Sequence, residues 1–287
     1  MPFRHKPRAP RIALALSGGA ARGLAHVGVL RALLENQLPI DCIAGTSAGS
    51  LVGGALASGM SIDEIEGIGR SLRWRDIGRM TMSRLGVQSN ERLEQYLRAR
   101  LPVTRFEKLP IPLAVVATDL QSGNAVVMRD QGDVPFAIRA SCTIPGWYVP
   151  VIDQNGRQLV DGGLVATVPA EVARSFQADI VIAVDVNAEG AKFLGPTSVI
   201  GVVLQSMMMV QKTATLHQLR QADCVIRPLV GHIRWDEMTR AGELIDKGYE
   251  AGRDSIAKIR RLIQMKVEQT PRWFRIRRRQ TVDQLDS

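Results

Sequence analysis

The sequence predicts an α/β protein in three layers, in which a mainly parallel central sheet lies between two layers of helices. Short apolar runs of strand length, such as 12–16 and 181–186, alternate with helical segments such as 24–36. That alternation favours parallel strands joined by helices. The 287 residues, 45% of them hydrophobic, can bury one sizeable core. Neither repeats nor low-complexity linkers interrupt the pattern.

The remaining elements follow from periodicity and from turn residues. Ser61 and Glu64 have the spacing of a capping box, which predicts a helix from that point to about residue 72. A stretch without clear periodicity, 74–88, is expected to be a loop. Further helices are expected at 90–101 and 196–221, and further strands at 41–44, 111–118, 124–129 and 158–160.

One turn has the composition of a nucleophile elbow. Residues 45–49, Gly-Thr-Ser-Ala-Gly, have the form G-x-S-x-G and stand between an apolar run and a run of small residues. Gly45 and Gly49 permit a strained turn that exposes the hydroxyl of Ser47, and the free N–H groups of the following helix favour negative charge there. Taken alone, the pentapeptide also fits a glycine-rich turn without any chemistry.

A second glycine-rich turn, 17–23, follows the first strand and suits an anion-binding backbone nest. Gly18, Ala20 and Gly23 occupy the three positions of G-x-G-x-x-G, which raises the alternative of a dinucleotide site. Such a site needs an acidic residue at the end of the second strand, whereas Asp41 stands at its start. The sequence therefore favours an oxyanion over a pyrophosphate as the bound anion.

The third motif is Asp161-Gly162-Gly163, which caps a short strand. With the two earlier turns, it gives the chain a resemblance to the patatin-like phospholipase family. That family carries a G-G-G-x-R/K-G loop, a G-x-S-x-G elbow and a D-G-A/G aspartate in this order. The similarity spans 12–172 and looks most like the small bacterial, single-domain branch related to the esterase domain of neuropathy target esterase.

The resemblance implies a patatin-like fold and a catalytic dyad in which Ser47 is the nucleophile and Asp161 the base. It also implies an oxyanion loop that includes Arg22, which keeps the loop rigid or favours negative charge; a surface arginine is the alternative. The residues expected to form the oxyanion site are Gly18, Gly19, Ala20, Arg22, Gly23 and Ala48. Ala20 replaces the third glycine of the family, and its methyl group is expected to fit only at negative φ.

The histidines provide an independent test, because a Ser-His-Asp hydrolase of the α/β type has its histidine after the acid. Only His217 and His232 follow Asp161. His217 lies in a helix-like polar stretch and His232 in a loop, and neither is in an obvious catalytic turn. His26 is expected to serve in packing or capping. The sequence thus favours a dyad over a triad.

The expected reaction is hydrolysis of a carboxylic ester through an acyl-serine intermediate. Asp161 accepts the proton of Ser47 during attack, and later assists the water that hydrolyses the intermediate. The resemblance implies phospholipid, lysophospholipid or another acyl ester as substrate. Two alternatives stay open, namely a lipid acyltransferase with the same dyad and a regulatory protein that keeps the fold with little activity.

Cysteine usage points to a reducing compartment and a cytoplasmic location. Cys42, Cys142 and Cys224 are few and odd in number. Neither cysteines nor histidines have the spacing of metal ligands, so no metal or cofactor is expected. The apolar run 12–16 is too short for a signal peptide. The uncharged run 42–62 is expected to be a strand and a buried helix, because an elbow lies within it.

The uneven charge divides the chain into three expected parts. A basic arm, 1–11, precedes a catalytic domain, 12–230, and a helical, basic extension, 231–287, follows it. Residues 253–279 hold ten Lys and Arg against two Asp and Glu, within a total net charge of +9. Such a tail could lie on the inner face of an anionic membrane, or dock on the domain as a terminal helix. Nucleic acid is not expected as a partner, since no recognition motif is present.

Two shorter segments leave alternatives open. Met207, Met208 and Met209 could line an adaptable acyl site, although the pattern favours a core helix. Residues 144–148 could shape a substrate cleft or only turn the chain toward the strand that carries Asp161.

Overall fold

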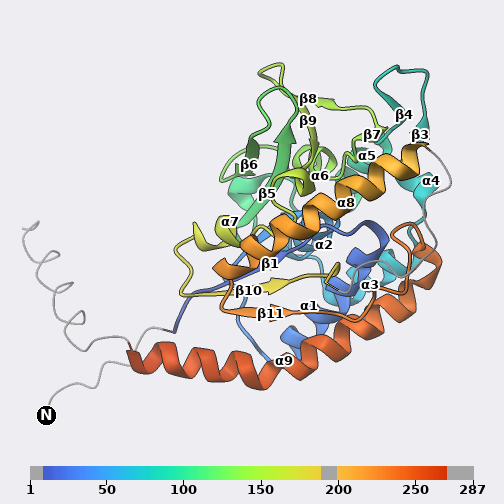
Figure 1. Ribbon diagram of the computed structural model, residues 1–287. Helices are drawn as coiled ribbons and strands as arrows, with labels where there is room; N and C mark the ends of the chain where they lie inside the picture. The colour runs from blue at the N-terminus through green and yellow to red at the C-terminus, as the bar shows by residue number, and fades with distance from the viewer. Residues whose placement is uncertain (1–8, 189–198, 270–287) are drawn as a thin grey trace, which may run out of the picture.

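A computed structural model of the chain describes residues 9–188 and 199–269 and places an eight-stranded sheet at its centre (Figure 1). The strand order is β11-β10-β1-β2-β5-β9-β8, with β6 paired to β5 beside that path. Strands β11 to β5 are parallel, whereas β6 and β9 run antiparallel to β5. The strands are β1 (Ile12–Leu16), β2 (Cys42–Thr46), β5 (Leu113–Asp119), β6 (Ala125–Arg129), β8 (Val151–Ile152), β9 (Gln158–Asp161), β10 (Ile180–Val184) and β11 (Cys224–Ile226).

Helices flank this mixed sheet, and the predicted α/β fold with a largely parallel sheet is confirmed. None of the helices within the described ranges combines the length and apolar character that crossing a bilayer requires. The α-helices are α1 (Ala25–Glu35), α2 (Ala48–Ala57), α3 (Ile62–Ser71), α4 (Trp74–Ile77), α5 (Glu91–Arg100), α6 (Val134–Ser141), α7 (Ala170–Arg174), α8 (Val199–Gln218) and α9 (Ala241–Gln269). Short 3₁₀ turns are η1 (Ala20–Leu24), η2 (Phe106–Lys108), η3 (Gly162–Leu164), η4 (Leu219–Gln221) and η5 (Met238–Arg240). The capping box of Ser61 and Glu64 is present at the start of α3.

Side-chain size separates the two faces of the sheet. Along β1, Leu14 and its neighbours two positions away belong to a core of large residues shared with α1, α2 and α9. The alternate positions, Ala13 and Ala15, face a second core of small residues that includes Ala170 and Ala173 of α7. Since successive strand residues point to opposite faces, this pattern lets helices pack on both sides and gives the three layers.

Helix α9 is held against α1 by direct contact between their backbones (Figure 1). A Cβ atom at Gly28 would lie 1.9 Å from the carbonyl oxygen of Ile245, and one at Gly248 would lie 1.9 Å from that of Ala25. Only glycine permits so close an approach. The two helices therefore form one packed unit.

This packing answers part of the question left open for the basic tail. Ile256 and Ile259 of α9 are buried in the large-residue core. The described part of residues 253–279 thus docks on the domain through its apolar side and leaves its basic side chains outside. The aromatic residues Trp273 and Phe274, like the first eight residues of the basic arm, lie outside the described residues.

The prediction of a loop at 74–88 is wrong, since this stretch contains helix α4 and two strands, β3 (Arg79–Met80) and β4 (Gly86–Ser89). Strand β4 pairs with β7 (Gly146–Tyr148) to complete a second, three-stranded sheet. The partner strand is some sixty residues away, so local periodicity gives no signal for this pairing.

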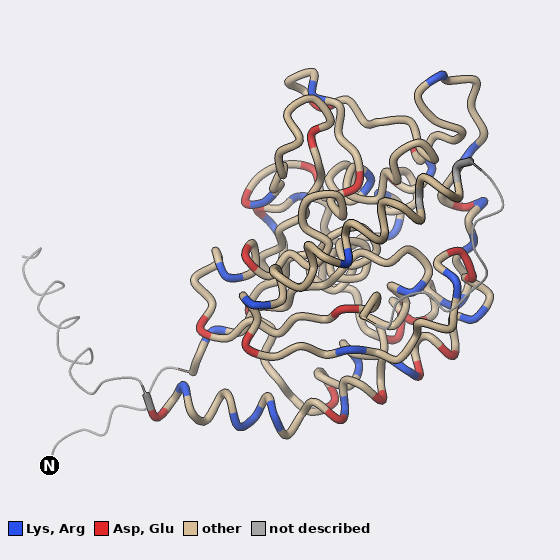
Figure 2. Tube along the Cα trace, viewed as in Figure 1, with Lys and Arg blue, Asp and Glu red and all other residues tan. Residues whose placement is uncertain are grey.

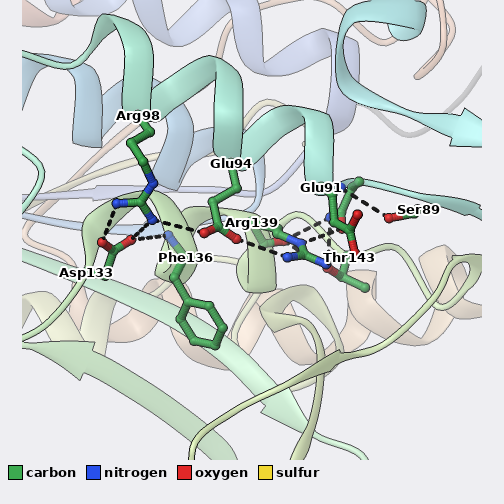
Figure 3. Close-up of polar contacts among 9 residues, drawn as sticks. Ser89, Glu91, Glu94, Arg98, Asp133, Phe136, Arg139 and Thr143 are labelled. Atoms are coloured by element: carbon green, nitrogen blue, oxygen red, sulfur yellow. Dashed lines mark hydrogen bonds and ion pairs between the residues drawn. The ribbon is translucent and has the colours of Figure 1, made fainter.

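Helices α5 and α6 are joined by a network of charged side chains (Figure 3). Arg98 contacts both carboxylate oxygens of Asp133, at 2.8 and 3.0 Å. One turn away, Arg139 donates to Glu94 at 3.0 Å and is largely buried. Partly buried ion pairs with several hydrogen bonds fix the relative position of two helices better than isolated surface pairs do. The network fixes the C-terminal end of α6, which lies against the candidate site.

Candidate active site

Ser47 lies in the turn between β2 and α2, with φ 51° and ψ −125°. A left-handed backbone is costly for a residue other than glycine and is typical of a serine held in a nucleophile elbow. The turn is possible because its neighbours are glycines. A Cβ atom at Gly49 would lie 2.2 Å from the carbonyl oxygen of Leu16, and one at Gly45 would lie 2.6 Å from the backbone of Ser50.

The buried hydroxyl of Ser141 accepts a hydrogen bond from the backbone of this turn. The N–H group of Ser47 donates to Ser141 Oγ at 2.8 Å, and Ser141 Oγ donates to the carbonyl oxygen of Val116 at 2.5 Å. Ser141 thereby connects the end of α6 to both the elbow and β5. The sequence contains no signal for this contact, because serine is common and the two serines are 94 positions apart.

Removing that hydroxyl is expected to loosen the elbow. Ser141→Ala leaves a buried N–H and a buried carbonyl without their partner, so we expect a loss of about 1–3 kcal/mol in the free energy of unfolding. We also expect kcat for ester hydrolysis to fall about tenfold, as a misplaced nucleophile reacts more slowly. Urea unfolding and ester assays measure both. Ser175→Ala, on the surface, is the control, and equal behaviour of the two variants would contradict this function of Ser141.

Asp161 stands across β5 from the elbow. In the register of the sheet, Thr46 pairs with Val116 and Asp161 pairs with Ala117. Ser47 and Asp161 are therefore separated by two strand spacings, about 10 Å between backbones, which their side chains bridge. A hydrogen bond from the Ser47 side chain lowers the pKa of the Asp161 carboxyl.

The environment of Asp161 suits a base. Burial raises the pKa of its carboxyl from 3.8 to about 6, although hydrogen bonds from Ser47 and from the Gly163 N–H oppose the shift. The Gly163 bond measures 2.8 Å and orients Oδ1. Gly162 allows the turn, since a Cβ there would lie 2.2 Å from the carbonyl oxygen of Val116. The carboxyl is ionised at neutral pH and accepts protons more readily than an exposed aspartate.

The glycine-rich loop differs in two respects from what the sequence predicts. The N–H of Gly18 donates to the carbonyl oxygen of Thr167 at 3.0 Å, which engages a donor expected to face an oxyanion. Ala20 has φ 50° rather than the negative value that its methyl group favours. Within the described residues, the N–H groups of Gly19, Ala20 and Ala48 have no protein acceptor.

Arg22 is buried rather than on the surface, with 1% of its area exposed. Its Nε donates to the carbonyl oxygen of Ile233 at 2.7 Å, and its Nη2 to that of Gly231 at 3.4 Å. The adjacent N–H of Ala21 donates to the carbonyl oxygen of Trp235 at 2.8 Å. Segment 231–235, far along the chain, therefore holds the glycine-rich loop. On its other side Gly23 packs directly against Ala48 of the elbow helix.

A cavity of about 420 Å³ brings these elements together. Ser47 and Asp161 lie in its wall beside residues 18–20, and helix α8 forms the opposite wall. Met207, Met208 and Met209 are part of that wall, so the core helix favoured by the sequence is wrong at this point. The large apolar members of the lining are Ile144, Pro145, Leu164, Met207, Met208, Met209, Leu216, Leu219 and Trp235.

None of the three histidines in the described residues lines the cavity that contains Ser47. His26 is buried in α1, where Nε2 donates to the carbonyl oxygen of Ser17 at 2.8 Å, and burial lowers its pKa to about 4. It is neutral at physiological pH and supports the start of the glycine-rich loop. His217 is exposed on α8, and exposed His232 pairs with Glu243 at 2.7 Å.

Comparison with known proteins identifies the family to which this chain is similar. The family model described as patatin-like phospholipase matches residues 14–174, which include both motif turns and Asp161. An uncharacterized NTE family protein of Mycobacterium bovis is 40% identical over 185 residues, covering 63% of this chain and 51% of that protein. Patatin-like phospholipase domain-containing protein 7 of Rattus norvegicus is 35% identical over 190 residues, which is 62% of this chain and 14% of that protein.

The chain thus spans about half the length of the mycobacterial relative. Among solved structures, VipD from Legionella pneumophila is similar with a TM-score of 0.54 and 16% sequence identity, covering 91% of this chain and 67% of that one. At that identity the likeness concerns the fold alone. Since the family model covers more than half of the chain and the fold agrees, this protein belongs to the patatin-like phospholipase family.

Proposed function

We propose that this chain is a lipid acyl hydrolase in which Ser47 attacks a carboxylic ester and Asp161 is the only protein base. The proposal depends above all on one observation: Ser47 and Asp161 line the same cavity, on either side of β5, where Thr46 pairs with Val116 and Asp161 with Ala117. Membership of the patatin-like phospholipase family supports lipid hydrolysis as the reaction class. The absence of a histidine from the described cavity lining supports a dyad.

In the first step, Ser47 Oγ forms a bond to the ester carbonyl carbon while its proton passes to Asp161. Collapse of the tetrahedral intermediate releases the alcohol, which takes up that proton, and leaves an acyl-serine. Asp161 then accepts a proton from water as the water oxygen attacks the acyl carbon. The bond between this carbon and Ser47 Oγ breaks, the carboxylic acid leaves, and the proton on Asp161 passes to Oγ, which regenerates Ser47. The Asp161 carboxyl thus takes up and returns a proton twice in each cycle, and a pKa of about 6 suits both directions of transfer.

The developing oxyanion needs fixed donors. We assign this function to the N–H groups of Gly19 and Ala20, with Ala48 at the start of α2 as a third. These groups have no acceptor among the described residues, whereas Gly18 is engaged with Thr167. The N-terminus of α2 adds a favourable field for negative charge.

The cavity supports an acyl ester of a lipid as the substrate, with phospholipid or lysophospholipid as the expected class. Methionine side chains adapt to acyl chains of different length, and three of them line the cavity that contains Ser47. An alcohol or lysolipid that replaces water at the acyl-serine would make the protein an acyltransferase. Product analysis with and without a lipid acceptor distinguishes the two reactions.

We further propose a cytoplasmic location with peripheral contact between residues 253–279 and an anionic membrane surface. The free cysteines Cys42, Cys142 and Cys224 support a reducing compartment. Exposed basic residues on α9, such as Lys258 and Arg261, support the electrostatic contact.

The test is hydrolysis of p-nitrophenyl butyrate and of a lysophospholipid by the wild type and by Ser47→Ala. We expect the variant to lose at least about 10³-fold in kcat/KM on both substrates, because removal of a catalytic nucleophile leaves only binding effects. His217→Ala and His232→Ala are the controls and should retain activity. Hydrolysis that survives in Ser47→Ala, or that depends equally on either histidine, would refute the dyad.

A further inference from the structure

Helix α8 carries apolar side chains toward the cavity and also toward solvent. Its inner face lines the cavity that contains Ser47 and Asp161. Its outer face is exposed to solvent, where apolar side chains are costly to leave uncovered. The large apolar residues exposed on α8, with their exposed fractions, are Val202 (51%), Val203 (50%), Met209 (66%), Val210 (73%) and Leu216 (64%). Met209 and Leu216 also line the cavity, so the exposed face borders the cavity at these two residues.

These residues form a continuous stripe. Positions 202, 209 and 216 are seven residues apart, and Val203 and Val210 adjoin them at the same spacing. Residues at that spacing share one side of a helix. The stripe therefore runs over about four helical turns, and we call it the α8 outer face.

The charge on this helix is of one sign. Val199–Gln218 contains no Asp or Glu, and its ionisable side chains are Lys212 and His217. In Figure 2, α8 is tan along its length apart from a blue position, in contrast to α9, where blue and red alternate. A surface that is apolar and carries no anionic side chain complements an anionic, lipid-rich surface.

The attachment of α8 leaves its outer face open. The helix is tied to the body at its C-terminal end, where Gln218 accepts from the N–H of Val168 at 2.9 Å and donates to the carbonyl oxygen of Val165 at 3.1 Å. Farther along, Gln211 packs against Gly163 beside Asp161. Neither contact involves the exposed apolar residues, and because Met209 and Leu216 also line the cavity, an occupant of the outer face would lie beside the cavity.

We propose that the α8 outer face docks on the surface of an anionic phospholipid bilayer. This inference rests on the proposed function, because it concerns how a lipid substrate reaches the same cavity. Docking through α8 places the wall of the cavity at the level of the lipid headgroups. An acyl ester of a bilayer lipid then reaches Ser47 by passing beside α8, without crossing bulk water.

The test uses the full chain with Val203→Glu and Val210→Glu combined. Both residues are exposed, and neither is among the described residues that line the cavity. The control combines Val127→Glu with Ile152→Glu, which are exposed apolar residues on β6 and β8. Binding is measured by cosedimentation with vesicles of phosphatidylcholine and phosphatidylglycerol in equal parts. Hydrolysis is measured with lipid in the same vesicles and with soluble p-nitrophenyl butyrate.

We expect the α8 variant to lose at least about tenfold in vesicle binding and in hydrolysis of vesicle lipid. Its hydrolysis of the soluble ester and its elution volume should match the wild type, as should all properties of the control. Vesicle binding is repeated with Ser47→Ala, which separates docking from catalysis. If Ser47→Ala binds vesicles and no form hydrolyses esters, the proposed function fails and docking stands.

Three results would overturn the docking proposal. The first is equal vesicle binding by the wild type and the α8 variant. The second is equal loss in the control variant, which would show a general effect of added charge. The third is a wild-type dimer that the α8 substitutions convert to a monomer, since the occupant of the face would then be a second copy of this chain.

Discussion

Asp161→Asn is expected to lower kcat/KM for ester hydrolysis by at least about 10³-fold, because an amide cannot accept the proton of Ser47. Asparagine keeps the size of the side chain, and its carbonyl oxygen can still accept from the Gly163 N–H, now 2.8 Å from Oδ1. The loss is therefore chemical rather than structural. Steady-state kinetics on p-nitrophenyl butyrate measure it, and circular dichroism checks that the fold is retained.

The same substitution is expected to stabilise the protein at neutral pH. Burial raises the pKa of the Asp161 carboxyl from 3.8 to about 6, so the folded state binds a proton more tightly than the unfolded state does. The stability that this gives is complete below about pH 4 and is lost as the pH rises through about 6. Above that range the wild type holds a buried carboxylate, at a cost of up to about 3 kcal/mol, which asparagine avoids.

Urea unfolding at several pH values measures this difference. We expect the variant to be more stable than the wild type above about pH 6, and the difference to shrink toward about pH 4. A variant that is less stable at neutral pH would contradict the assignment of a buried, strained carboxylate to Asp161.

The rate should follow the same ionisation. Since only the carboxylate accepts a proton, kcat/KM of the wild type should rise about tenfold per pH unit below about 6 and level off above it. A profile that is flat across this range would show that another group, or none, limits the reaction.

Arg22→Met is expected to be the most destabilising change near the site. The guanidinium is buried and donates to the carbonyl oxygens of Ile233 and Gly231. Its removal leaves these groups without their donor, so we expect a loss of about 3 kcal/mol in the free energy of unfolding. The loop that carries Gly19 and Ala20 loses its anchor, and kcat/KM should fall about 10²-fold.

Controls separate the anchor from charge in general. Arg22→Lys retains the charge but not the planar set of donors, and should restore little of the loss. Arg234→Met removes an exposed guanidinium from the same segment, where it pairs with Asp236 at 2.8 Å, and should change stability by less than about 0.5 kcal/mol. Wild-type stability and activity in Arg22→Met would contradict the anchoring function.

Segment 231–235, which provides these contacts, falls within the extension that the sequence sets apart from the catalytic domain. Its carbonyl oxygens hold the glycine-rich loop, and the following helix α9 packs on α1. The division at residue 230 stays a prediction. Because of these contacts, we expect a chain truncated after residue 230 to lose activity.

Local composition was enough to predict most of the strands, the elbow and the aspartate turn. Each depends on neighbours in the sequence: glycines beside Ser47 that tolerate a tight turn, and Ser61 three positions before Glu64. The long helices with a clear apolar side, such as α1 and α5, are likewise where periodicity places them, to within a few residues.

What the sequence missed depends on distant contacts. Ser141 binds the elbow across 94 positions, and β4 finds its partner in β7. A helix that covers a core and a helix that lines a cavity can have the same pattern of methionines. The sequence pattern therefore could not show that the methionines of α8 line a cavity. The positive φ of Ala20 is set by the loop around it, which Arg22 ties to Ile233.

The central claim is that Ser47 is a nucleophile activated by Asp161 alone. The most direct measurement is the rate and position of labelling by a fluorophosphonate, followed by mass spectrometry of the wild type and of Asp161→Asn. The account predicts a single adduct on Ser47 in the wild type, at a rate that rises with pH to a plateau above about 6, and a much slower reaction in the variant. An adduct on another residue, or equal labelling rates in the two proteins, would contradict it.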